Sequence, residues 1–168
     1  MSTRSVLARV KGDGFEGRYA HCDGYPTARG KELFESYREL GSAEALIKYA
    51  LREGESGYWS SYCPPSELVE ADRSTPEGEA AFQNSYKTGI RYNWAHETDS
   101  FDLIQSDGDN WGTEWAYVIA DKGLSVFEAR YKDNDYKQPF WAYIGTYAWD
   151  SEPNWEAVEN TNNGEDES

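Results

Sequence analysis

The feature that most constrains this chain is the strand pattern at each of its two ends. At the N-terminal end, Ser5–Lys11 alternates roughly, Gly12-Asp13-Gly14 is a strong turn signal, and Phe15–His21 alternates again. This pattern predicts a β-hairpin with a three-residue loop. A hairpin places the start of its first strand opposite the end of its second, so Arg4-Ser5 is expected beside His21-Cys22.

A second run of strands is predicted near the C-terminal end. Glu114–Ala120 has a strong strand pattern, and Asp121-Lys122-Gly123 is a hairpin turn into Leu124–Arg130. A further turn near Asp133-Asn134-Asp135 leads to a strand over Phe140–Tyr147. The three strands are therefore expected to form an antiparallel meander.

Two amphipathic helices are predicted between these strands. Thr27 is the expected N-cap of the first and Gly41 its C-terminal cap, while Ser42 caps the second, which closes near Gly54. Their apolar faces carry Leu33, Phe34, Tyr37 and Leu40, and then Ala45, Leu46, Tyr49 and Ala50. Neither face can be left in water, so the expected class is α+β: an antiparallel sheet, made of the N-terminal hairpin and the C-terminal meander, packed against a two-helix hairpin.

The rest of the chain has a weaker pattern. Ser66–Ala71 predicts a helical turn, Arg73–Gly78 a turn-rich connector, Gly89–Ala95 a strand and Glu97–Thr113 a long loop. From Asp150 the chain becomes acidic and rich in asparagine.

The length of 168 residues suits one domain. We expect a single α+β domain over 1–149 and a largely disordered acidic tail over 150–168. No apolar run approaches the roughly 20 residues of a membrane span, and no secretory signal is visible, so a cytoplasmic location is expected.

Charge is distributed unevenly along the chain. The net charge is −15, yet residues 1–52 carry +2, whereas residues 53–168 carry −17 together with all seven Trp. Such a field repels phosphates, so direct nucleic-acid binding and membrane association are not expected. It favours a basic protein partner. The alternatives are that acidity serves solubility alone or that an acidic face imitates DNA.

The densest cluster of reactive side chains lies in Tyr19–Pro26, at the exit of the N-terminal hairpin. Along a strand, His21 and Asp23 would point to one face and Cys22 to the other. An imidazole beside a carboxylate can act as an acid/base pair, and Ser5 could supply a hydroxyl. His21, Asp23 and Ser5 are therefore the candidate catalytic residues. The alternative is an ordinary turn that redirects the chain into the first helix.

Metal and cofactor sites are not expected. Cys63 and His96 stand alone, without the paired spacing of zinc ligands, and two cysteines are too few for a disulfide framework. Asp107–Gly112 resembles the start of a calcium loop, but Val118 occupies the position of the closing glutamate. No phosphate-binding glycine loop or dinucleotide fingerprint is present.

One arginine and four aromatic side chains are the remaining candidates. The candidate ligand-binding or interaction residues are Arg4, Tyr19, Tyr25, Trp59 and Trp111. A nucleic-acid stacking platform also needs a basic groove, which this chain lacks, so most of the aromatic residues are expected in the core.

The N-terminal motifs resemble a known family. Met1-Ser2-Thr3-Arg4-Ser5 and then Gly17–Thr27 are similar to small uncharacterised proteins of bacteriophages and bacteria, frequent in actinobacterial phages. Those proteins begin Met-Ser-Thr-Arg and carry His-Trp-Asp-Gly-Tyr-Pro further on, where this chain has Cys22 in place of the Trp. The resemblance covers residues 1–40 and continues loosely in Glu114–Ile119. It implies a phage or prophage origin, expression in the host cytoplasm and no particular activity.

Three functions follow as hypotheses. The leading one is a phage accessory protein that binds a host or phage macromolecule through an acidic, Trp-rich surface, in counter-defence or host takeover. The second is a small hydrolase or transferase with His21 and Asp23 as its acid/base pair. The third is a virion or assembly component.

Overall fold

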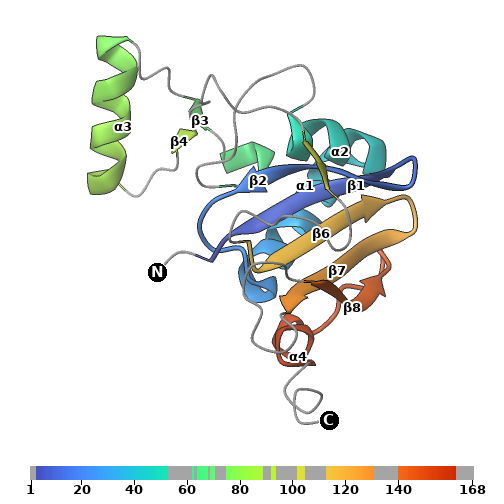
Figure 1. Ribbon diagram of the computed structural model, residues 1–168. Helices are drawn as coiled ribbons and strands as arrows, with labels where there is room; N and C mark the ends of the chain where they lie inside the picture. Colours follow the sequence, from blue (N-terminus) through green and yellow to red (C-terminus); the bar gives the residue numbers. More distant parts are fainter. Residues whose placement is uncertain are drawn as a thin grey trace.

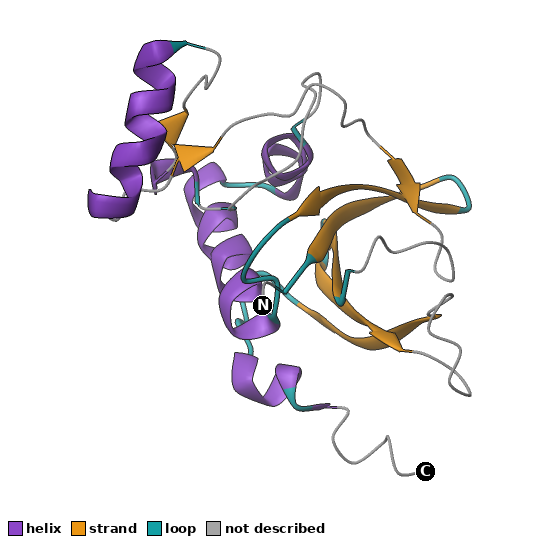
Figure 2. Ribbon diagram, turned by 60° about the vertical axis from the view of Figure 1, so that its left-hand side comes forward, coloured by secondary structure: helices purple, strands orange, loops and turns teal. Residues whose placement is uncertain are grey.

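The centre of the molecule is a six-stranded sheet with helices packed on it. The strands, in their order across the sheet, are β5 (Asp102–Ile104), β2 (Gly14–Ala20), β1 (Ser5–Lys11), β6 (Trp115–Ala120), β7 (Gly123–Arg130) and β8 (Phe140–Tyr147). The helices are α1 (Lys31–Leu40), α2 (Ala43–Leu51), α3 (Pro76–Thr88) and α4 (Trp155–Glu159) (Figure 1). Figure 2 shows the helices gathered on one side of the sheet, which confirms the α+β class.

The computed structural model describes most but not all of the chain. The described residues are 3–52, 62, 64–67, 69–70, 75–88, 92–93, 102–104, 113–130 and 140–161. Among the helices in these ranges, none has the length and apolar composition needed to cross a membrane.

β1 and β2 form the predicted N-terminal hairpin. Lys11 pairs with Gly14 at its end, so the connection consists of Gly12 and Asp13 alone. The prediction of a three-residue loop is therefore wrong. Gly12 adopts φ +59°, a left-handed conformation that glycine reaches without the steric penalty of a Cβ atom.

The predicted C-terminal meander is also present, and the two halves of the sheet meet in an unexpected way. β6, β7 and β8 are antiparallel neighbours. β1 and β6, in contrast, pair in parallel, with Ser5 opposite Trp115 and Ala8 opposite Val118. A parallel pair requires a long crossover, and the chain between β2 and β6, which contains the first three helices, provides it.

The caps predicted between the first two helices are confirmed. Gly41 ends α1 in the left-handed conformation at φ +87°. Ser42 Oγ then accepts a hydrogen bond of 3.1 Å from the backbone N–H of Ala45, in the first turn of α2. The chain therefore reverses between the two helices within two residues.

The outer limits of the same two helices differ from the prediction. Thr27 is not an N-cap, because it lies inside a π-helical turn, Pro26–Gly30, that leads directly into α1. α2 ends at Leu51 rather than near Gly54, because Arg52 takes the left-handed conformation at φ +53°. Both differences concern helix ends, where local contacts decide the last turn.

Two predictions for the middle of the chain are wrong. The expected connector over Arg73–Gly78 contains the start of α3, which begins at Pro76. Proline is favourable in a first helical turn because no N–H is needed there. The expected loop over Glu97–Thr113 contains β5, which pairs with β2 at the edge of the sheet. Three residues are too short a run to reveal their period in the sequence.

Two further predictions are met only in part. Within Ser66–Ala71 the structure has the end of a 3-10 turn, Pro65–Glu67, followed by β3 (Val69–Glu70). Of the strand expected over Gly89–Ala95, β4 (Tyr92–Asn93) is described, and it pairs in parallel with β3. The turn near residues 133–135 lies outside the described residues.

The main core lies between the sheet and the helices. Leu7, Tyr117 and Leu124 reach it from the strands, and Phe34 and Leu46 from α1 and α2. All five side chains are almost completely buried. At about 25 cal/mol per Å² of apolar surface removed from water, this layer supplies the main driving force of folding.

β6 shows the alternation that its sequence predicts. Trp115, Tyr117 and Ile119 face the main core, whereas Ala116 and Val118 face a second apolar cluster on the opposite side of the sheet. Both faces of this central strand are therefore buried, which explains its nearly continuous apolar sequence.

Residues 150–161 do not form the disordered tail expected of them. α4 buries Trp155 and Val158 against the main core. The acidic composition of this segment predicted disorder, although its two apolar side chains have the spacing of one helix face. Residues 162–168 lie outside the described residues.

α4 packs on the π-helical turn that precedes α1. A Cβ atom added at Gly30 would lie 2.5 Å from the ring of Trp155, so only glycine permits this close approach. Glu159 Oε1 accepts hydrogen bonds from the backbone N–H of Thr27 at 3.1 Å and from its hydroxyl at 2.9 Å. A carboxylate is favourable at this helix start, where the first N–H groups lack partners within the helix.

Candidate functional site

The exit of the hairpin, where the sequence placed a catalytic pair, is not extended. β2 ends at Ala20, and both Cys22 and Asp23 adopt left-handed conformations, with φ of +64° and +52°. Strand alternation therefore stops before Asp23. The prediction that His21 and Asp23 share a strand face is wrong, because the chain turns between them.

His21 is oriented by a tyrosine. Its Nδ1 lies 2.8 Å from the hydroxyl of Tyr19, and the two rings are stacked with centroids 5.9 Å apart. Burial and the neighbouring Arg4 guanidinium lower the pKa of His21, which favours the neutral imidazole. Asp23 is exposed. The hydrogen bond that sets the ring's orientation thus comes from Tyr19.

Ser5 is fully buried beside the same turn. The backbone N–H of Gly24 donates to the carbonyl oxygen of Thr3 at 2.9 Å, so the start of β1 does lie against the hairpin exit, as predicted. Ser5 Oγ accepts a long hydrogen bond of 3.4 Å from Nε of Arg29. A Cβ atom on Gly24 would lie 2.7 Å from the Cβ of Ser5, which leaves no room for a substrate between them.

Arg29 is the centre of the polar network at this point, and the sequence reasoning missed it. Its side chain is 1% exposed. Nη2 donates to the carbonyl oxygen of Cys22 at 2.6 Å, Nη1 donates to Oε1 of Glu32 at 3.1 Å, and the guanidinium lies 5.0 Å from the centroid of the Tyr62 ring. Arg29 lies four residues before Leu33, on the buried side of the helix, and this spacing was the available signal.

The network continues into the sheet. The Tyr117 hydroxyl donates a short hydrogen bond of 2.5 Å to the carbonyl oxygen of Gly24. Burial raises the pKa of Tyr117 well above its ordinary value, so the hydroxyl keeps its proton. Tyr62, in turn, donates to Ser36 Oγ at 2.9 Å. The buried polar groups of the hairpin exit therefore bond to one another and join the turn to sheet and helix.

The remaining predicted site residues are dispersed. Arg4 is exposed, while Tyr19 and Tyr25 are half-buried, Tyr25 against the main core. Trp59 and Trp111 lie outside the described residues, as do Cys63 and His96. Within the described part of the chain, no three His, Cys, Asp or Glu side chains gather as metal ligands would.

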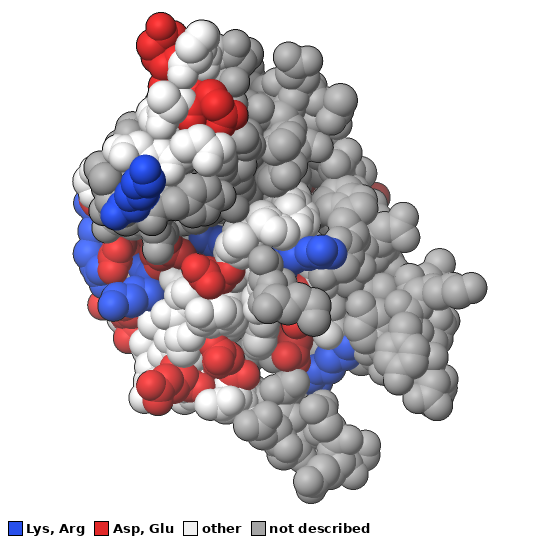
Figure 3. Space-filling model, turned by 90° about the vertical axis from the view of Figure 1, so that its left-hand side faces the viewer, with Lys and Arg blue, Asp and Glu red and all other residues white. Residues whose placement is uncertain are grey.

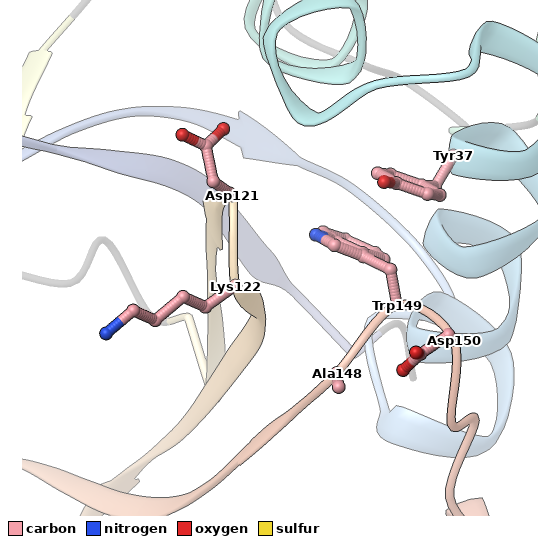
Figure 4. Close-up of a pocket in the computed structure, with 6 residues that line it drawn as sticks. All are labelled: Tyr37, Asp121, Lys122, Ala148, Trp149 and Asp150. Carbon is pink, nitrogen blue, oxygen red and sulfur yellow. The ribbon is translucent and has the colours of Figure 1, made fainter.

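A second candidate site is a hollow at the opposite end of β6, which no sequence motif indicated. Its volume is about 410 Å³. Its lining comes from three separate segments and consists of Tyr37, Asp121, Lys122, Ala148, Trp149 and Asp150 (Figure 4). Sites for small ligands or single side chains have volumes of about 300–1,000 Å³, so this hollow is large enough for one.

An aromatic pair forms one wall of this hollow. The rings of Tyr37 and Trp149 are stacked, with centroids 4.4 Å apart and an interplanar angle of 3°. The Trp149 indole N–H donates to the carbonyl oxygen of Ala120 at 2.8 Å. Trp149 is only 8% exposed, whereas Tyr37 is half-buried. The pair is thus fixed in position, and Tyr37 offers the accessible aromatic surface.

The rim of the hollow is charged. Asp121, Lys122 and Asp150 are exposed, and no ion pair joins any of them to another described residue. On the face on the α3 side, Figure 3 shows acidic side chains of the described residues interspersed with basic ones. Among the described residues on that face, the carboxylates do not form the ordered row that imitation of DNA requires.

Comparison with known proteins gives no family for this chain. No protein-family model, no curated protein and no solved structure matches it.

Proposed function

We propose that this protein acts by binding a basic macromolecular partner, most simply a protein, and not by catalysis. The observation that carries the proposal is a contrast between the two candidate sites. At the hairpin exit, Ser5, Arg29 and Tyr117 are buried and bonded to neighbouring groups. At the hollow, Asp121 and Asp150 face solvent beside an accessible ring.

The charge of the chain supports the same proposal. Residues 53–168 carry a net charge of −17, and this part of the chain contributes Asp121 and Asp150 to the hollow. A field of this sign attracts basic surfaces and accelerates their association. The resemblance of the N-terminal motifs to phage and bacterial proteins suggests a context, a phage accessory protein working in the host cytoplasm.

A hydrolase or transferase centred on His21 has less support. Such an enzyme needs a base oriented toward a nucleophile beside a space for substrate. Tyr19 is the partner of His21, and Ser5 is buried against Gly24 and Arg29. His21 lines neither the hollow beside Tyr37 and Trp149 nor a small apolar hollow on the opposite face of the sheet, next to Trp141.

The test is capture of a partner from bacterial lysate followed by reconstitution with purified components. We expect a basic protein that binds directly, survives nuclease treatment and dissociates as the salt concentration rises, because screening weakens exposed charge pairs. Binding that disappears with nuclease, or no salt-sensitive partner at all, would contradict the proposal. A hydrolytic activity that is lost in His21→Gln would favour the enzyme instead.

A further inference from the structure

We propose that the hollow lined by Tyr37, Asp121 and Asp150 receives the guanidinium group of an arginine on the surface of the partner. This inference rests on the proposed function and assigns the site through which it operates.

The carboxylates of the lining offer several hydrogen-bond acceptors to a ligand. Asp121 and Asp150 bring carboxylates from two different segments, and in Figure 4 they lie on either side of the Trp149 indole. The indole N–H of Trp149 already donates to Ala120, so this donor is not available to a ligand. A guanidinium has five N–H donors and no acceptor, which complements such a lining.

The aromatic wall favours a flat cation. Tyr37 is held parallel to Trp149 at 4.4 Å and keeps part of its own surface accessible. Figure 4 shows the Tyr37 hydroxyl at the end of the ring nearer Asp121, where it adds one more acceptor. Arginine stacks on aromatic rings and binds carboxylates through a planar fork, whereas lysine offers a compact, strongly hydrated charge.

The one cation in the lining does not occupy the hollow. Figure 4 shows the side chain of Lys122 extending away from the Tyr37–Trp149 pair. The segment that follows the hollow, residues 150–159, has four acidic residues and no Lys or Arg. These carboxylates would therefore repel an anionic ligand, and the indole N–H of Trp149 is not available to bind one. The local charge favours a cation.

The experiment uses the full chain and three capped peptides, Gly-Arg-Gly, Gly-Lys-Gly and Gly-citrulline-Gly. Citrulline has nearly the shape of arginine but no charge. The indole N–H resonance of Trp149 is followed by two-dimensional NMR as each peptide is added. We expect a saturable shift with the arginine peptide, a weaker response with lysine and none with citrulline.

Matched variants locate the binding. Asp121→Asn combined with Asp150→Asn should weaken the arginine peptide about fivefold or more, as expected for the loss of two exposed charge pairs. Glu77→Gln combined with Glu114→Gln removes the same charge from exposed positions outside the hollow and should leave affinity unchanged. Lys122→Ala should strengthen binding slightly.

The outcomes separate this inference from the proposed function. Three results would overturn the arginine site. They are an equal loss of arginine-peptide affinity in both double variants, an equal NMR response to the citrulline peptide, and no shift of the Trp149 resonance. If the lysate partner still binds in that case, the proposed function stands and another surface carries it. If the peptide binds at the hollow but no basic partner exists, the site stands and the proposed function fails.

Discussion

A single buried arginine does most to define the N-terminal part of this protein. The Arg29 guanidinium is bonded to the carbonyl oxygen of Cys22, to the carboxylate of Glu32 and to a hydroxyl on β1, so it joins three separate segments. A buried charge is tolerated only where its donors are satisfied in this way. His21 is one of only two histidines in the sequence, but Arg29, which bonds to the carbonyl oxygen of Cys22, has the more demanding environment.

Arg29→Met should lower the free energy of unfolding by about 3 kcal/mol, because it leaves Glu32 and the Cys22 carbonyl oxygen without their donor in a buried site. Urea denaturation followed by circular dichroism measures the change. Arg38→Met is the matched control, since the ion pair of Arg38 with Glu152 is half-exposed and should be worth about 1 kcal/mol or less. Equal losses in the two variants would show that the Arg29 network is not stabilising.

At the scale of elements, the short helix α4 differs most from its expected role. Its sequence, Trp-Glu-Ala-Val-Glu, has the composition of an acidic tail, and five residues are too few to form a stable helix alone. Packing stabilises it instead: Trp155 lies on Gly30, and Glu159 bonds to Thr27. The helix therefore depends on contacts with residues more than 100 positions earlier in the chain.

Trp155→Ala should cost about 3–5 kcal/mol of stability, because it removes a large buried ring from the main core. The measurement is the shift of the thermal and urea transitions. Glu156→Ala, at the next and exposed position of α4, should change stability by about 0.5 kcal/mol or less. A loss near the control value would mean that α4 does not pack on the core.

At the scale of the whole molecule, two properties matter: how the halves of the sheet join and how the charge is spread. The parallel pairing of β1 with β6 joins the two halves into one sheet on which α1 packs, and the meander places the segment after β8 beside the end of β6. These three segments line the hollow. The chain also carries 31 acidic against 16 basic residues, so its charges repel one another on balance.

Added sodium chloride should therefore raise the midpoint of thermal unfolding, because screening relieves more repulsion than it weakens ion pairs. Differential scanning calorimetry over a series of salt concentrations measures the effect. The double variant Glu77→Gln and Glu114→Gln, with a smaller net charge, should show a smaller rise. A midpoint that falls with salt would indicate that ion pairs outweigh the repulsion.

Local sequence patterns predict the parts of this protein that depend on near neighbours in the chain. Periodicity and turn chemistry act over a few residues. They predict the N-terminal hairpin, the three strands of the C-terminal meander, the Gly41 and Ser42 caps and the α+β class. The proximity of Ser5 to the hairpin exit also followed, because hairpin geometry is local.

The other features of the fold depend on long-range contacts. Contacts between residues far apart in the chain have no local sequence pattern. Such contacts produce the pairing of β1 with β6, the burial of Arg29 and the docking of α4. The hollow is the clearest case. Tyr37, Asp121 and Trp149 are unremarkable in sequence, and they become a candidate site because packing brings three segments to one place.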